Sequence, residues 1–566
     1  MHFVNLYSLL SILFVSISII EANVLPVQNA RALELLDRRS PSDYAPKRAQ
    51  CPSNTLARSS KLGINPDEKA YVSARQPNAQ TAFSQWINSL NAGFGNVDSS
   101  TTPVLSLASS GGGFRAMLTG AGVHQALDSR EQNASKLKGL YQSLIYESGL
   151  SGGSWLLGSI MGNNWQTITQ IKEEVWYRTL PGTPLLPDQS KFLFSYADVL
   201  AAITAKKVSG YDPTLIDVYG RLLGYSLLEQ SEGGIKQTLS SITSQSNYAN
   251  HNYPFPIVTT VQSQAAQQCS DDEIGATQFE YSPLEFGSWD SAIASFIPTN
   301  YTGSIVGNDG VPSCITGFDN LGFIMGASSD IFPEFCASVP KKEASDAQKV
   351  YNFTQSVLHQ IQKPTFRDVY AAFPDSFDKQ ALSASAYPPE RRLFPDKPTE
   401  LYMMDGGFSG QVNPIWPFLH RQIDVLFVED SSSDTQYNFP NGSSIYETYT
   451  QAQAKGLSRM PTIPTPAEFV QKGYNTRPTF FGCDQGSDVM TIVYLPNNAY
   501  VYPSNTSTYK LSYTKPEIDG MLANGQAVAT YNGTAGYDTC VACVTLKKTS
   551  ASLPSACSKC FTDYCA

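Results

Sequence analysis

Short apolar runs that end in glycine-rich turns and continue into helical stretches recur along this 566-residue chain. Val104–Ala108, for example, leads directly into Ser-Ser-Gly-Gly-Gly, which is typical of a buried strand that enters a loop. Repeated strand–loop–helix units predict an α/β fold whose sheet is covered by helices on both faces. The pattern predicts strands at 104–108, 140–147 and 423–428, and helices at 115–127 and 155–161.

The N-terminus has the pattern of a secretory leader. Residues 6–20 form an uncharged apolar run that is short for a membrane span, and Ala22 is a suitable cleavage residue. We expect a signal peptide over 1–22, with an N-terminal membrane anchor as the alternative.

Residues 23–50 carry two dibasic pairs and are expected to be a pro-segment or a disordered leader. No linker divides 51–566, which is expected to be one unit, irregular between 180 and 400, where Pro, Gly and Tyr are frequent.

Charge and cysteine content narrow the class of protein. Acidic residues outnumber basic ones by 49 to 39, and this balance argues against a protein that tracks nucleic-acid phosphates. The ten cysteines suit disulfides in an oxidising compartment. Within the Cys-rich end, 540–565, Cys540-x-x-Cys543 and Cys557-x-x-Cys560 have nearly zinc-ribbon spacing, but disulfides are favoured, with the pairing open. Six sequons indicate a glycoprotein: Asn133, Asn300, Asn352, Asn441, Asn505 and Asn532.

The strongest local signal for chemistry is Gly149-Leu150-Ser151-Gly152-Gly153, which satisfies G-x-S-x-G. In this pattern a strand turns sharply into a helix and presents one hydroxyl at the apex. The flanking glycines permit a cramped backbone, and the helix N-terminus adds positive potential. Ser151 is therefore a candidate nucleophile.

A second glycine-rich turn lies upstream, at Ser109–Arg115 (SSGGGFR). Consecutive glycines expose backbone N–H groups that can hold a phosphate or the oxyanion of an acyl-transfer intermediate. A dinucleotide fingerprint over Gly111 to Ala116 and a plain flexible turn are the alternatives. Arg115 follows the glycines and could bind a phosphate through two nitrogens.

A serine nucleophile requires a base, and the chain offers two kinds. Asp405, in Met-Met-Asp-Gly-Gly, suits a tight turn after a strand, although an isolated Asp-Gly turn is ordinary. Of the four histidines beyond the leader none lies in a motif, and His420 is the best triad candidate among them. A Ser-Asp dyad suffices if the carboxylate of Asp405 reaches the hydroxyl directly and an oxyanion hole lowers the barrier.

The three segments SGGGFRAM, GLSGGSW and MDGGFSGQVNPIWP occur in a family-specific order, and with them the chain resembles the fungal phospholipase B (lysophospholipase) family. The resemblance extends from about Cys51 to the Cys-rich end. It implies a catalytic domain over 51–566 that is similar to cytosolic phospholipase A2 and, more distantly, to patatin. Such a domain has an α/β sheet with a cap insertion over the site.

The resemblance also implies roles for individual residues. Ser151 matches the family's nucleophile, and Asp405 matches its dyad partner. Gly112 and Gly113 match the glycines whose N–H groups form the oxyanion hole, and Arg115 matches the arginine that engages the substrate phosphate. The expected reaction is hydrolysis of acyl esters of lysophospholipids at a micelle or membrane surface, with both esters of diacylphospholipids as an additional candidate substrate.

The same resemblance implies no metal, no cofactor and no protein partner. The acidic net charge argues against a nucleic-acid partner as well. Many fungal members continue into a Ser-rich stretch and a GPI signal, whereas this sequence ends at Ala566. We therefore expect a secreted protein, extracellular or in the periplasmic space or cell wall of a fungus. A hydrolase of neutral esters or galactolipids and a structural adhesion glycoprotein are the alternatives.

Overall fold

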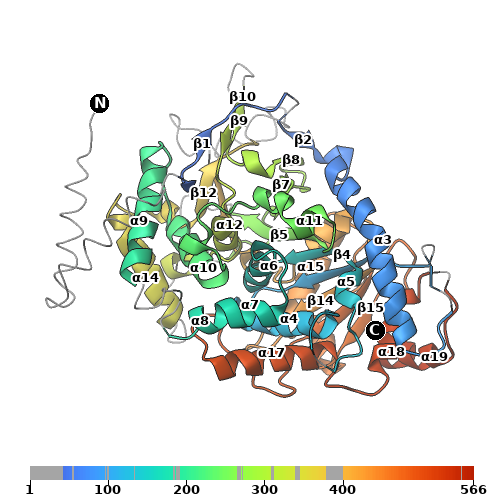
Figure 1. The fold of residues 1–566 in the computed structure, drawn as a ribbon. Coiled ribbons are helices and arrows are strands. Elements are labelled where there is room, and N and C mark those ends of the chain that lie inside the picture. Colours follow the sequence, from blue (N-terminus) through green and yellow to red (C-terminus); the bar gives the residue numbers. More distant parts are fainter. Residues whose placement is uncertain are drawn as a thin grey trace.

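The computed structural model shows a large mixed sheet with helices packed on it (Figure 1). Helices α9, α10 and α14 gather at one end of the molecule, and the C-terminal α18 and α19 lie at the other. The structure describes residues 43–53, 56–95, 97–98, 101–132, 134–182, 185, 192–263, 269–270, 272–306, 312–337, 345–377, 400–549 and 551–566.

The sheet has twelve strands among the described residues, ordered β15-β16-β14-β3-β4-β5-β6-β7-β8-β2, with β13 and then β12 joined to β5. Strands β16, β14, β3, β4 and β5 run parallel, and the others pair antiparallel. The strands of the sheet are β2 (Arg58–Ser59), β3 (Leu105–Ser109), β4 (Leu144–Gly149), β5 (Phe255–Gln262), β6 (Gln278–Tyr281), β7 (Glu285–Ser288), β8 (Ser295–Pro298), β12 (Ala371–Pro374), β13 (Glu400–Met404), β14 (Val425–Asp430), β15 (Thr479–Phe481) and β16 (Thr491–Pro496).

Two pairs of two-residue strands lie outside the sheet: β1 (Lys47–Arg48) with β11 (Ile315–Thr316), and β9 (Ile305–Val306) with β10 (Pro312–Ser313).

The helices vary from about one turn to almost seven turns in length. The helices are α3 (Pro66–Ser89), α4 (Gly113–Leu127), α5 (Leu140–Ser143), α6 (Gly152–Gly162), α7 (Ile168–Ile171), α8 (Tyr177–Thr179), α9 (Phe192–Val208), α10 (Leu215–Leu227), α11 (Ser246–Ala249), α12 (Leu321–Ser328), α13 (Phe332–Ala337), α14 (Ser345–His359), α15 (Ser443–Ala454), α16 (Pro466–Gln471), α17 (Lys515–Ala529), α18 (Tyr537–Leu546) and α19 (Ala556–Tyr564).

Two consecutive residues of β4 demonstrate that helices cover both faces of the sheet. The Tyr146 hydroxyl donates to Glu68 of α3, whereas Glu147 is hydrogen bonded to His124 of α4. Successive side chains of a strand point to opposite faces, so α3 and α4 lie on different sides. This confirms the predicted α/β architecture.

The predicted elements around the glycine-rich turns are present with small shifts, as β3, α4, α6 and β14. One boundary was wrong: residues 140–143 form α5, and only from Leu144 does the apolar run become a strand. Burial is complete or nearly so on both sides of that boundary, so hydrophobicity could not separate helix from strand.

The expectation that 180–400 is irregular is wrong for much of its described part. That region contains β5, at the centre of the sheet, and α12, which packs against β5. Both elements are short and almost entirely apolar or small, with no alternation of polar and apolar positions. A fully buried element has no polar face, and its period is therefore hidden.

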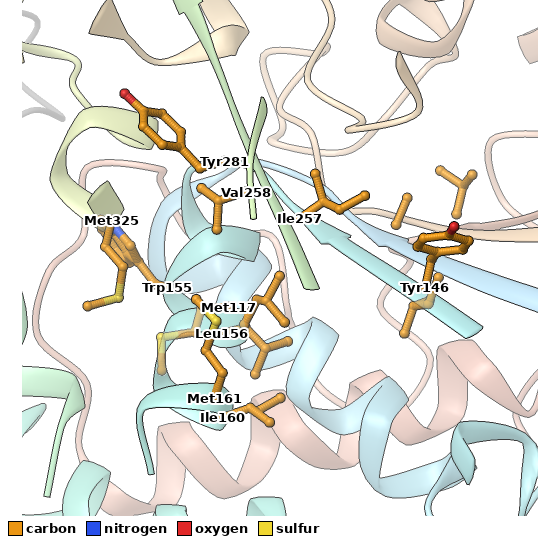
Figure 2. Packing of buried hydrophobic residues seen from close by; sticks show 14 of the residues in the cluster. Met117, Tyr146, Trp155, Leu156, Ile160, Met161, Ile257, Val258, Tyr281 and Met325 are labelled. Carbon is orange, nitrogen blue, oxygen red and sulfur yellow. The ribbon is translucent and has the colours of Figure 1, made fainter. Parts of the chain in front are cut away.

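The core is continuous across the sheet and its helices. Figure 2 shows Leu156, Ile160 and Met161 of α6 gathered with Met117 of α4. Helix α17 packs against α4, and the two backbones approach each other closely at Gly122 and Gly525. A Cβ placed on Gly122 would lie 2.1 Å from the carbonyl oxygen of Leu522, so only glycine permits this approach.

Residues 43–50, assigned from the sequence to the leader, are packed onto the fold. The Tyr44 hydroxyl donates to Asp217 at 2.8 Å, β1 pairs with β11, and Cys51 forms a disulfide with Cys314. The described fold therefore begins at least eight residues before Cys51. The expected signal peptide, 1–22, and residues 23–42 lie outside the described part of the chain.

All ten cysteines are paired, as the predicted disulfides require. The two C-x-x-C segments are joined to each other, by Cys540–Cys560 and Cys543–Cys557, which confirms disulfides over a zinc ribbon there. The remaining pairs are Cys51–Cys314, Cys269–Cys336 and Cys483–Cys565.

None of the helices in the described part of the chain combines the length and the apolar character that crossing a bilayer requires.

The contact between α4 and α17 predicts that Gly122→Ala destabilises the protein. The added methyl group must displace backbone, and such overpacking costs about 1–3 kcal/mol or more. Chemical denaturation measures the loss. Gly486→Ala is the control, because a Cβ there meets no atom within 4 Å, and equal stabilities of the two variants would contradict the packing described.

Candidate active site

Two strand ends meet head to head along one edge of β5. Gly149, the last residue of β4, lies opposite Val258, and Met404, the last residue of β13, lies opposite Val261. Both strands pair with the same edge of β5, and β6 pairs with the opposite edge. Since β4 runs parallel to β5 and β13 runs antiparallel to it, the chain leaves both strands into the same gap. That gap, about 10 Å long at 3.3 Å per residue, holds Ser151 and Asp405.

Ser151 has a strained backbone of the kind that G-x-S-x-G predicts. Its φ is 52° and its ψ −118°, a combination that residues with a side chain rarely adopt. The glycines that follow allow close backbone packing: a Cβ on Gly152 would lie 2.1 Å from the Gly113 carbonyl oxygen, and one on Gly153 would lie 2.0 Å from that of Ser109. The glycines of the motif therefore allow β4, α6 and the upstream glycine turn to pack in close backbone contact.

The carboxylate of Asp405 lies close enough to the Ser151 hydroxyl for that hydroxyl to lower its pKa, and it accepts the Gly407 backbone N–H at 2.8 Å. Burial raises the pKa of Asp405 to about 6, while the Ser151 hydroxyl and the Gly407 N–H oppose that rise. A carboxylate with a pKa near neutrality is a better proton acceptor than an ordinary surface aspartate. The two residues lie next to each other, as a base and its nucleophile must.

The upstream glycines lie beside Ser151 at the N-terminus of α4. Gly112 and Gly113 have φ values of 138° and 61°, and a Cβ on Gly113 would lie 2.4 Å from the Thr508 carbonyl oxygen. Among the hydrogen bonds of the described residues, none is donated by the backbone N–H of Gly112 or Gly113. Free N–H groups at a helix N-terminus suit the stabilisation of an oxyanion.

Arg115 is fully buried, with most of its guanidinium committed to backbone carbonyls. Nε donates to Ser431 at 2.9 Å and Nη1 donates to Thr506 at 2.7 Å. Burial lowers the pKa of Arg115 to about 10, so the group stays charged at neutral pH. Nη2 has no partner among the described residues and lies 2.6 Å from a Cβ built on Gly112. A phosphate role for Arg115 therefore rests on Nη2 and remains a prediction.

An apolar cavity begins at Ser151 and is lined in part by residues of α13 and α14. The space is narrow: about 20 Å³ can hold the centre of a water molecule. Its walls are Gly113, Ser151, Trp155, Tyr219, Ser329, Ile331, Phe332, Ala347, Val350, Thr508 and Leu511.

His420 and His124 form contacts with residues other than Ser151. His420 stacks on Trp289 with ring centroids 5.0 Å apart, and burial lowers the pKa of His420 to about 3. His124 is bonded to Glu147 and to the Gly120 carbonyl. In the part of the chain that the structure describes, no histidine is hydrogen bonded to Ser151.

The six sequons differ in accessibility. Asn352 and Asn532 are exposed, and Asn300, Asn441 and Asn505 are partly buried. Asn133 lies outside the described residues.

The segment Ser328–Asp330, which begins with the last residue of α12, is also part of the site, and sequence reasoning missed it. The Ser151 N–H donates to the Ser328 carbonyl at 3.1 Å, and the Asp405 N–H donates to the Asp330 carbonyl at 3.2 Å. The one available signal was a cluster of polar residues, SSD, at the end of an apolar stretch.

Comparison with known proteins identifies the relatives of the chain. The model of the lysophospholipase catalytic domain matches residues 105–566. Lysophospholipase 1 of Candida albicans is 35% identical over 92% of this chain and 89% of its own length. A lysophospholipase of Penicillium chrysogenum is also 35% identical, over 93% and 90%. Probable lysophospholipase 3 of Schizosaccharomyces pombe is 34% identical, over 95% and 84%.

Among solved structures, human GIVD cytosolic phospholipase A2 has the same fold, with a TM-score of 0.64 at 16% identity. The match covers 88% of this chain and 69% of that one. The identity of about a third to these fungal relatives, over most of their length, shows the family to which the chain belongs. The chain is a lipid ester hydrolase that belongs to the lysophospholipase family.

Proposed function

We propose that this chain is a secreted glycoprotein that releases fatty acid from lysophospholipids through a Ser151–Asp405 dyad and an acyl-enzyme. Diacylphospholipids are its further substrates. The observation that carries the proposal is the placement of Ser151 and Asp405 in one gap at the edge of β5, where the Ser151 hydroxyl lies near the Asp405 carboxyl and lines an apolar cavity.

In the first half of the reaction Asp405 accepts the hydroxyl proton as Ser151 Oγ attacks the ester carbonyl carbon. The negative charge that develops on the carbonyl oxygen is stabilised by the N–H groups of Gly112 and Gly113. The carbon–oxygen bond to the glycerol then breaks, and the glycerol oxygen leaves with the proton from Asp405. The fatty acid remains esterified to Ser151.

In the second half a water molecule gives a proton to Asp405 and attacks the acyl carbon. The bond between the acyl carbon and Oγ breaks, the proton returns from Asp405 to Ser151, and the fatty acid is released. Each half needs Asp405 ionised at its start and protonated in its middle, and a pKa of about 6 suits both states near neutral pH.

The acyl chain enters along the apolar cavity, which must widen to hold it. Trp155, Phe332, Val350 and Leu511 line it, and together they offer a fatty chain a nonpolar environment next to the attacking oxygen. Ser151 and Asp405 are 5% and 6% exposed, so residues that line the cavity must move apart before a substrate enters.

A hydrolase of neutral esters is the second candidate function. The observation in its favour is that two of the three guanidinium nitrogens of Arg115 already donate to backbone carbonyls. A phosphate would then be held by Nη2 alone, with less geometric selection than a bidentate contact gives.

Secretion is supported by the five disulfides, because cytosolic reductants keep most thiols free. The exposed sequons Asn352 and Asn532 are accessible to a glycosyltransferase.

The proposed substrate and nucleophile are tested together by fatty-acid release from lysophosphatidylcholine in the presence of EDTA. We expect release by the wild type and a loss of about 10⁴-fold or more in Ser151→Ala. Monoacylglycerol is the companion substrate: a faster rate on the phospholipid supports the phosphate contact, and a faster rate on the neutral ester favours the second candidate. Equal release by wild type and a folded Ser151→Ala would refute the nucleophile.

The pKa of Asp405 predicts the acid limb of the pH–rate profile. Only the carboxylate accepts the Ser151 proton, so kcat/KM should fall about tenfold per pH unit below pH 6 and level off above it. Rates measured from pH 4 to 8, with recovery after return to pH 7 to exclude unfolding, check this. Full activity at pH 4.5 would contradict the role of Asp405 as the base.

The cavity predicts that Val350→Trp selects against long acyl chains, because the larger side chain fills the space under α14. The ratio of kcat/KM for a long-chain over a short-chain lysophospholipid should fall by about 10-fold or more. Val470→Trp, at an exposed site on α16, is the control and should leave the ratio unchanged. An unchanged ratio in Val350→Trp would place the acyl chain elsewhere.

A further inference from the structure

The two residues of the dyad are both tied to one tripeptide, Ser328–Asp330. As described above, the N–H of Ser151 donates to the first carbonyl of this tripeptide and the N–H of Asp405 donates to the last. These residues are at most 2% exposed, so water does not compete for their hydrogen bonds. The tripeptide thus spans the gap between the ends of β4 and β13.

The Ser328 hydroxyl strengthens one end of this bridge. It accepts the Ser151 N–H at 3.0 Å and donates to the Thr259 carbonyl of β5 at 2.7 Å. One side chain therefore connects the nucleophile's backbone to the central strand. No other side chain in the described part of the chain accepts a hydrogen bond from the Ser151 N–H.

The next residue of β5 strengthens the other end. The Thr260 hydroxyl donates to the Met404 carbonyl at 2.6 Å, immediately before Asp405. Thr259 and Thr260 thus hold the nucleophile and the base through adjacent residues of one rigid strand.

Ser151 requires such support, because its backbone is strained. A non-glycine residue at φ 52° and ψ −118° keeps that conformation only where its surroundings fix it. Relaxation would rotate the hydroxyl away from Asp405, and a displacement of about 1 Å can cost about 10²-fold in rate. The glycines of the motif permit the strained turn, but they do not hold it.

We propose that Ser328 is a positioning residue, which through its hydroxyl fixes the backbone of Ser151 against β5 and keeps Ser151 in register with Asp405. Ser328 does not touch the reacting atoms. The inference rests on the proposed Ser151–Asp405 dyad and adds the element that sets the distance between its members.

The test is Ser328→Ala, assayed for kcat, KM and the acid limb of the pH–rate profile on lysophosphatidylcholine. We expect kcat to fall about 10- to 100-fold with KM within about twofold, because substrate binding does not use this hydroxyl. The acid limb should move to higher pH. The nearby Ser151 hydroxyl lowers the pKa of Asp405, and a displaced Ser151 no longer does so.

Ser304→Ala is the matched control. Ser304 is equally buried, and its hydroxyl also accepts one backbone N–H and donates to one carbonyl, both of Ile315. It should lose similar thermal stability and keep wild-type kcat and pH profile. If the two variants have the same kcat and acid limb, the positioning role is refuted.

Thr260→Val is the second variant, which decides the matter if Ser328→Ala does not fold. It keeps the branched shape, removes the bond to Met404, and should lower kcat with little change in KM. Wild-type kcat in Thr260→Val would overturn the bridge. The wild type separates this inference from the proposed function: inactivity of the wild type refutes the function, whereas an active wild type with unaffected variants refutes only the inference.

Discussion

The active site depends on the opposed ends of two strands that share one edge of β5. A parallel strand and an antiparallel strand on the same edge release their chains into one gap, so β4 and β13 bring together residues that are 254 positions apart in the sequence. Neither the serine turn nor the aspartate turn assembles the dyad by itself. Their pairing follows from the register of both strands on β5, and a slip of either strand would separate the dyad.

Close backbone contact is the second constraint on the site. The glycines after Ser151 press against the turn that carries Gly112 and Gly113, and this contact places the N–H groups of the turn near the nucleophile. Glycine is required there because a Cβ would overlap carbonyl oxygens, not because the chain must be flexible. The same close packing, between α4 and α17, supports the helix whose N-terminus faces the site.

Sequence was sufficient for the parts whose pattern is local. The apolar run before each glycine turn identified β3 and β4, and the G-x-S-x-G spacing identified Ser151 together with its strained backbone. Asp405 needed the family resemblance, because an Asp-Gly turn has no local signature of a base. The structure places Ser151 and Asp405 in the same gap, and their catalytic roles remain proposals.

Sequence was insufficient where burial or distance decided the structure. The central strand β5 and helix α12 have no polar face and therefore no visible period, and the region that contains them was expected to be irregular. The commitment of Arg115 to Ser431 and Thr506 joins residues more than 300 positions apart, and no motif records such contacts. Ser328–Asp330 was missed for the same reason.

The central claim is that the acyl group is transferred to Ser151 before water releases it. Rapid acid quenching of the enzyme during turnover of lysophosphatidylcholine, followed by mass spectrometry of its peptides, tests this most directly. The account predicts a peptide that contains Ser151 and carries the mass of the fatty acyl group. Sustained turnover with no acylated peptide, or with the acyl group on another residue, would contradict it.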